Sequence, residues 1–120
     1  MGNIERFEDI IAWQAGRILG VELYREFEHL KDFDFRSQMR KAAISITNNI
    51  SEGFAYGRSK DFSRFLRYAY GSANEVKSMC YLAFDIGYLN ENKLNYFKSE
   101  CDRVSFLIRR LREGVERKPG

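Results

Sequence analysis

The sequence contains few of the residues that interrupt helices. Its 120 residues include a single proline, Pro119, next to the last residue. Proline removes a backbone donor and clashes with the preceding helical turn, so the lack of any other proline permits long helices. No run of about twenty apolar residues, signal-peptide pattern or low-complexity segment is present. We therefore expect one soluble, cytoplasmic domain over residues 1–120, without membrane contact.

Residues that support catalysis or metal binding are also scarce. The two cysteines, Cys80 and Cys101, are too few for a disulfide framework and have no CxxC spacing, so we expect them to pack as small hydrophobes. The one histidine, His29, lies in an expected connection between helices. Neither Glu52 nor Glu75 is followed three residues later by a histidine, as di-iron bundle sites require. We expect no enzyme activity, no metal and no cofactor.

Apolar residues recur every three or four positions over four long segments, which is the spacing of amphipathic helices. The pattern predicts helices at about residues 8–28, 35–55, 59–87 and 90–114. In the first helix the expected inner face consists of Ile11, Ala15, Ile18, Leu19, Leu23 and Phe27. In the third it consists of Phe62, Phe65, Leu66, Ala69, Ala73, Val76, Met79, Cys80, Ala83 and Ile86.

Short connections between these segments force neighbouring helices to run antiparallel. The sequence therefore predicts an all-α fold, an antiparallel up-down-up-down four-helix bundle. We expect Ser59 and Asn90 to cap the third and fourth helices at their N-termini, and Gly87 to end the third. Gly71 falls inside a helix, where glycine costs about 1 kcal/mol relative to alanine, so we expect another backbone to approach it closely.

A row of polar residues follows the apolar stripe of residues 36–53. Ser45, Asn49 and Glu52 are spaced by three or four positions and share one side of a helix. An unpaired amide or carboxylate in the core costs on the order of 2 kcal/mol. The row therefore predicts polar partners on the next helix, which offers Ser72 and Glu75. We expect a hydrogen-bond network in which Glu52 bonds to Ser72 or a nearby backbone amide; a ligand pocket is the alternative.

The chain has a net charge of +3. Its basic side chains gather at the start of the third predicted helix and at the finish of the fourth. In an antiparallel bundle the start of the third helix lies at the same end as the finish of the fourth. Such an end suits phosphate contacts, although Glu5, Glu8 and Asp9 share it and partly neutralise it. The alternative is a solvated face whose charges pair locally, as Asp61 with Arg64. The basic residues brought together are Arg58, Lys60, Arg64, Arg67, Arg109, Arg110 and Arg112.

The chain has more aromatic residues than a slim bundle core holds, namely 10 Phe, 7 Tyr and 1 Trp. Tyr56, Tyr68 and Tyr70 are close in sequence to the basic positions and are candidate surfaces for base stacking. Tyr68, Tyr81 and Phe84 fall outside the inner stripes. Because exposed apolar patches mark interfaces, we expect a homo-oligomer with ring symmetry.

Four blocks of the sequence resemble one known family. They are FEDIIAWQAG near the start, NNISEG followed by phenylalanine, FLRYAYGSANEV, and FDIGYLNENKL. In order and spacing they are similar to the four-helix-bundle proteins encoded inside intervening sequences of bacterial 23S ribosomal RNA genes. The resemblance covers roughly residues 7–111. The chain departs from it at Thr47, where the family usually has proline, and at Ser51, where it often has alanine. We therefore expect the local start or bend of that helix to differ from the family's.

The resemblance implies a bacterial protein without enzyme activity that assembles as a pentameric barrel. It also implies a relation to the accessory variability determinant of diversity-generating retroelements, which works with a reverse transcriptase and nucleic acid. The expected function is binding of RNA or DNA backbone through a basic surface formed when a ring-shaped homo-oligomer assembles. Expected partners are other copies of the chain, RNA or DNA, and a reverse transcriptase or other protein. The alternative is a structural or protein-interaction module that binds no nucleic acid.

Overall fold

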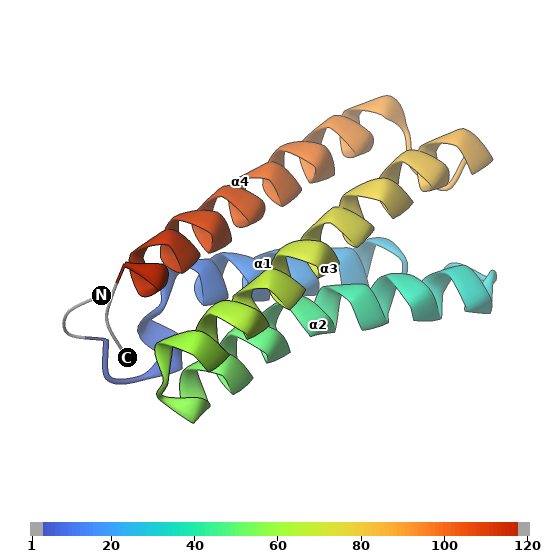
Figure 1. Ribbon diagram of the computed structural model, residues 1–120. Helices are drawn as coiled ribbons and strands as arrows, with labels where there is room; N and C mark the ends of the chain where they lie inside the picture. The colour runs from blue at the N-terminus through green and yellow to red at the C-terminus, as the bar shows by residue number, and fades with distance from the viewer. Residues whose placement is uncertain (1–3, 118–120) are drawn as a thin grey trace.

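The computed structural model describes residues 4–117, and its regular elements are all helical. A short 3-10 helix, η1 (Phe7–Asp9), precedes four α-helices (Figure 1). These are α1 (Ile11–Glu26), α2 (Phe33–Tyr56), α3 (Ser59–Ile86) and α4 (Glu91–Glu116). The first helix is shorter than predicted because the chain is extended at Ile10, between η1 and α1.

Each helix packs against its neighbour in sequence, and α1 also packs against α4, while the diagonal pairs stay apart. The helices run alternately up and down, so the start of α1 and the finish of α4 lie at the same end (Figure 1). The bundle measures 48 × 22 × 19 Å. None of the helices within residues 4–117 has both the length and the apolar character needed to cross a bilayer.

The helix ends follow from a few local side chains and glycines. The Asn90 Oδ1 atom accepts a hydrogen bond from the Lys93 amide at 2.8 Å, so Asn90 caps α4 as predicted. Gly87 ends α3 in the left-handed region, with a φ of 97°. The prediction for Ser59 is wrong. Arg58 is the extended residue before α3, so Ser59 is already the first helical residue and its side chain is not in the capping position.

The core is one continuous cluster formed by the inner stripes of all four helices. Leu19, Ile46, Leu66 and Ile108 are fully buried, one from each helix. Burying a side chain of this size stabilises the fold by about 1.5–3 kcal/mol relative to leaving it in water. The large stripes therefore account for most of the cohesion between helices.

Four predicted core positions lie outside this cluster, namely the partly buried Phe65 and three exposed isoleucines. Ile11 is 62 % exposed, Ile18 is 56 % exposed and Ile86 is 55 % exposed. Ile11 is the first residue of α1, directly after the extended Ile10, and Ile86 is the last residue of α3. Ile18 is next to Leu19, which points inward, and adjacent helical residues project about 100° apart. The inner face of α1 uses Ala12 and Gly16 instead.

Two glycines, but not the predicted one, allow helices to approach closely. A Cβ on Gly16 would lie 3.0 Å from the Ile46 side chain, and a Cβ on Gly53 would lie 2.7 Å from Cβ of Phe65. These contacts bring α1 onto α2 and α2 onto α3. Gly71 is exposed, and a Cβ there would have no neighbour within 4 Å, so the expected backbone approach at Gly71 is wrong within the protomer.

Part of the predicted polar network is present between α2 and α3. The Asn49 amide donates to the Ser45 carbonyl at 2.7 Å and to the Ser45 hydroxyl at 2.8 Å. The Ser72 hydroxyl donates to the Ser45 hydroxyl at 2.8 Å and so joins the two helices. These three side chains are partly buried, so their mutual hydrogen bonds replace those they lose to water.

Glu52 and Glu75 do not belong to this network. Both are exposed, and within residues 4–117 neither side chain makes a hydrogen bond or ion pair. The antiparallel register explains this. Ser45 faces Ser72 and Gly53 faces Phe65, which places Glu52 about two helical turns from Ser72. The expected bond from Glu52 to Ser72 is therefore wrong.

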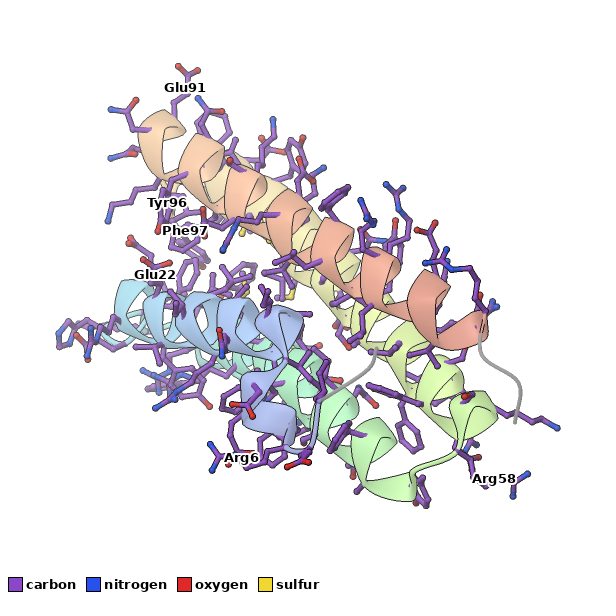
Figure 2. All side chains as sticks on the ribbon, turned by 90° about the vertical axis from the view of Figure 1, so that its left-hand side faces the viewer. Arg6, Glu22, Arg58, Glu91, Tyr96 and Phe97 are labelled. Carbon is purple, nitrogen blue, oxygen red and sulfur yellow. The ribbon has the colours of Figure 1, made fainter. Side chains whose placement is uncertain are left out.

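Three hydrogen bonds tie the α3–α4 hairpin to α1 and the connection after it. Tyr96 donates to Glu22 Oε2 at 2.6 Å, Lys93 Nζ lies 2.8 Å from Glu26 Oε1, and Tyr88 donates to Asp32 Oδ2 at 2.6 Å. Figure 2 shows Tyr96 on α4 facing Glu22 on α1. The bond to the Glu22 carboxylate raises the pKa of Tyr96 to about 12.

We predict that the polar network contributes to stability through Ser45 and not through Glu52. Ser45→Ala removes the hydroxyl that accepts from both Asn49 and Ser72, and it leaves Asn49 only the backbone carbonyl of residue 45. We expect it to lower the free energy of unfolding by about 1 kcal/mol. Glu52→Ala, the matched control on the same helix, should change it by less than about 0.5 kcal/mol. Urea denaturation measures both. A larger loss for Glu52→Ala than for Ser45→Ala would contradict this assignment.

We also predict a loss of stability at alkaline pH that depends on Tyr96. The folded state raises the pKa of Tyr96, so its contribution is fully present below the ordinary tyrosine value of about 10. It is lost as the pH rises through about 12. Tyr96→Phe should be less stable than the native chain by about 1 kcal/mol at pH 8, and the difference should shrink above pH 10. Urea unfolding at several pH values tests this, and a difference independent of pH would contradict it.

Candidate nucleic-acid interface

The start of α3 and the finish of α4 meet at one end of the bundle, as the antiparallel order predicts. Arg67 NH2 on α3 lies 3.0 Å from Glu116 Oε2 on α4. The Ser63 hydroxyl donates to the same carboxylate oxygen. Ser63 is the one polar residue buried among those described. Glu116 thus anchors the end of α4 to the first turns of α3.

Each of two carboxylates at this end serves two arginines. Asp61 lies 3.9 Å from Arg58 and 3.5 Å from Arg64. Glu116 lies 3.0 Å from Arg67 and 3.9 Å from Arg112. The hydrogen bond from Ser63, followed by that from Arg67, holds the pKa of Glu116 below its usual range. Cations therefore remain in excess at these pairs.

The pairing of Asp61 with Arg64 matches the alternative of local charge pairing. It does not fix these cations in place, because ion pairs this exposed contribute only about 0–1 kcal/mol. Because these ion pairs are weak, a phosphate group that approaches Arg64 or Arg67 can replace the carboxylate at little cost in free energy. The geometry is therefore compatible with both interpretations of the basic end.

A polar groove of about 240 Å³ lies between α3 and α4. On α3 its residues recur at steps of three and four, continuing the face that carries Arg67. Arg109 lies in it on α4 and, within residues 4–117, forms no ion pair. Lys77 Nζ lies 2.7 Å from Asp102 Oδ1, and this hydrogen bond raises the pKa of Lys77. The lining residues are Tyr70, Asn74, Lys77, Asp102, Ser105, Phe106 and Arg109.

Aromatic rings lie beside the cations of this groove. The Arg109 and Arg110 guanidinium carbons are 5.8 Å and 5.7 Å from the centre of the Phe106 ring, and about half of Phe106 is exposed. The Arg112 guanidinium carbon lies 6.0 Å from the Tyr70 ring. An exposed ring beside guanidinium groups can stack on a base while the cations contact phosphates. We call the residues Arg67, Tyr70, Lys77, Phe106, Arg109 and Arg112 the α3–α4 strip.

Lys77 and Phe106 are absent from the set predicted by sequence. Their signal was the spacing, because Lys77 is ten residues after Arg67 and Phe106 is three before Arg109, which places each pair on one helical face. Lys77 is an isolated lysine, apart from the groups of basic residues on which the predicted set was based. Of the predicted stacking residues, Tyr70 joins the strip. Tyr56 instead stacks on Phe65 with ring centres 5.3 Å apart.

The seven predicted phosphate contacts do not form one patch. Arg58, at the α2–α3 turn (Figure 2), and Lys60 lie at the extreme end of the bundle. Arg110 lines a different pocket, with Asp9 and Leu107, between α4 and the start of α1. Consecutive residues on a helix diverge by about 100°, so Arg109 and Arg110 line different pockets although both guanidinium groups lie beside Phe106. Asp9 lines the same pocket as Arg110, but its ion pair is with Arg6, at 3.7 Å.

Other reactive side chains lie apart from this surface. Cys80 and Cys101 are buried next to each other in the core, where the hydrogen bond with the Cys80 thiol and then burial raise the pKa of Cys101. His29 is exposed in the connection between α1 and α2. Among the residues that the structure describes, no three His, Cys, Asp or Glu side chains gather in a way that could hold a metal ion. The α3–α4 strip offers cations and ring faces.

Comparisons with known proteins identify the family. The chain is similar in structure to a protein of unknown function from the S23 ribosomal protein family of Bacteroides thetaiotaomicron. The TM-score is 0.79 at 19 % sequence identity, over 85 % of this chain and 98 % of that one. At this identity the likeness shows the shared fold. A search of curated proteins finds no match to the chain. The family described as 23S rRNA-intervening sequence protein matches residues 8–110, so this chain belongs to that family.

Proposed function

We propose that this protein is a non-enzymatic, oligomeric helical bundle that binds the backbone of RNA or DNA. The observation that carries the proposal is the α3–α4 strip, in which Arg109 and Arg112 lie beside exposed or partly exposed rings. Arg67 lies on the same strip and pairs with Glu116 near the surface. Phosphate contacts from arginine and lysine supply most of the affinity in sequence-independent binding. Stacking on Tyr70 and Phe106 favours single-stranded segments, whose unpaired bases are free to stack on protein rings.

The proposal includes assembly into a ring, a pentamer by resemblance to the family. Exposed apolar side chains on the outer side of α3 support it, because Tyr68, Tyr81 and Leu82 are each about half exposed. Repetition of the strip around an axis would raise the positive potential several-fold over that of one protomer. Arg58, Lys60, Arg64 and Arg110, which lie outside the strip, would then contribute from neighbouring copies.

The names of the relatives agree with contact to nucleic acid. One is assigned to a ribosomal protein family, and the family itself is described by its place within a ribosomal RNA gene. The resemblance to the accessory variability determinant of diversity-generating retroelements adds a reverse transcriptase as a proposed protein partner. Both relations favour RNA over duplex DNA as the first ligand to test.

A second candidate function is a structural or protein-interaction module without nucleic-acid binding. Its support is the same exposed apolar residues on α3, which a partner protein would cover. Salt dependence separates the two functions, since binding through phosphates weakens steeply with salt and binding through apolar surface does not.

We predict that Arg109 is a phosphate contact. Fluorescence anisotropy with a labelled single-stranded RNA should give an affinity that falls between about 50 and 200 mM salt. Arg109→Ala should weaken binding and reduce the slope of log K against log salt by about 0.7, the value for one contact on a single strand. Arg109 forms no ion pair within residues 4–117, so the fold should keep its melting temperature.

The matched control is Arg103→Ala, an exposed arginine on the same helix that lines neither α4 pocket described above. It should leave both the affinity and the slope unchanged. The double variant Arg64→Glu and Arg67→Glu should flatten the slope further. Absence of RNA binding by the native chain at about 50 mM salt would overturn the proposal and favour the interaction module.

A further inference from the structure

A second groove, between α1 and α2, is larger than the α3–α4 groove and has a different chemistry. Its volume is about 430 Å³. Trp13, Val21 and Tyr24 line it from α1, and Ile44 and Thr47 line it from α2. Val21 is 43 % exposed and Ile44 is 42 % exposed. The groove therefore presents an apolar surface formed by one row of residues on α1 and one on α2. No other described element of the protomer covers it.

Gly20 gives this groove an open centre. It lies four residues after Gly16, and both glycines line the groove. Gly16 is required by the protomer, since a Cβ there would lie 3.0 Å from Ile46. Gly20 is not required, because a Cβ there would meet nothing within 4 Å. A glycine inside a helix lowers stability relative to alanine, and nothing in the described chain uses the space it leaves. That space admits a side chain from outside.

The charges around the groove are all of one sign. Arg17 and Arg25 line it, and within residues 4–117 neither forms an ion pair. Arg17 lies 5.6 Å from the Trp13 ring, and Arg40 lies 4.5 Å from the Tyr24 ring. No carboxylate is among the lining residues.

The acidic residues of α1 face elsewhere. Glu22 bonds to Tyr96 and Glu26 to Lys93, both on the side of α4. The cations and carboxylates of α1 are thus separated onto two faces. The groove face is left with an apolar floor and a cationic edge, which is complementary to an apolar stripe bordered by carboxylates.

We propose that the α1–α2 groove binds an amphipathic helix of a partner protein, with apolar residues facing Trp13, Gly20 and Ile44 and with carboxylates facing Arg17 and Arg25. Helix-in-groove recognition uses apolar anchors at spacings of three and four, which match the two helical rows of the groove. The site is separate from the α3–α4 strip and does not depend on the proposed nucleic-acid function.

Trp13 provides a direct readout, because it is the single tryptophan of the chain and lines the groove. The probe is a synthetic helical peptide of about 18 residues, without tryptophan, that carries leucines on one face and glutamates beside them. Titration into the full-length protein should shift the Trp13 emission to shorter wavelength and saturate. A peptide with lysines in place of the glutamates should bind about tenfold more weakly. Equal affinity for the two peptides, or no saturable shift, would overturn the proposal.

Two sets of variants test the site itself. Gly20→Leu should fill the open centre and weaken the glutamate peptide at least about tenfold. It should also raise the melting temperature by about 4 °C, since a glycine leaves the helix. Gly71→Leu is the matched control, since it is another helical glycine whose Cβ would have free space. It should raise the melting temperature without affecting the peptide. The pair Arg17→Glu and Arg25→Glu should reverse the peptide preference. Unchanged binding in Gly20→Leu would contradict the assignment.

Two other occupants give distinct results. A shift of Trp13 emission that follows protein concentration without peptide, together with a rise in mass by light scattering, would place a second copy in the groove and overturn the proposal. A shift caused by a single-stranded RNA and abolished by Arg17→Glu and Arg25→Glu would place nucleic acid there and also overturn it. Loss of RNA binding in Arg109→Ala leaves the peptide result unaffected, so the two proposals fail separately.

Discussion

The antiparallel packing of α3 against α4 is the interaction on which the rest of the structure depends. Leu66 and Val76 on α3, and Val104 and Ile108 on α4, are fully buried in it. Burial of side chains this large contributes about 1.5–3 kcal/mol each, whereas the exposed pair Arg67–Glu116 contributes about 0–1 kcal/mol. The apolar stripes therefore set the register, and the charged contacts are its consequence. That register lets Arg67 and Arg112 share Glu116. It also places Lys77 and Arg109 in one groove.

Much of the fold can be predicted from the sequence because its signals are local. The helical spacing of apolar residues needs no partner to be recognised, and the cap at Asn90 and the stop at Gly87 depend only on neighbouring backbone. The errors arise where the outcome depends on register between helices. Glu52 has the right spacing to join Ser45 and Asn49. The register of α3 on α2 pairs its neighbour Gly53 with Phe65, so Glu52 lies about two helical turns from Ser72. The predicted backbone approach at Gly71 is wrong for the same reason, because the sequence does not show which helical glycine lies where two helices cross.

The candidate site likewise has a part that the sequence predicts and a part that depends on how the helices are oriented. The order of helices predicts that the basic ends of α3 and α4 meet, and Glu116 joins them. The direction of each side chain follows from its angle on the helix, so Arg109 and Arg110 separate although they are adjacent in sequence. The two hairpins of the bundle then present different surfaces, a polar cationic groove on α3–α4 and an apolar groove with cationic edges on α1–α2. A protein with both could hold a nucleic acid and a protein helix at once.

We propose above all that the register of α3 and α4 creates a surface that binds nucleic acid. Photo-crosslinking to a single-stranded RNA carrying 4-thiouridine, followed by mass spectrometry of the crosslinked peptides, tests it most directly. The account predicts crosslinks at Tyr70 and Phe106, whose rings lie within the α3–α4 strip. Crosslinks confined to Trp13 and Tyr24 on the α1–α2 face, or none at low salt, would contradict it.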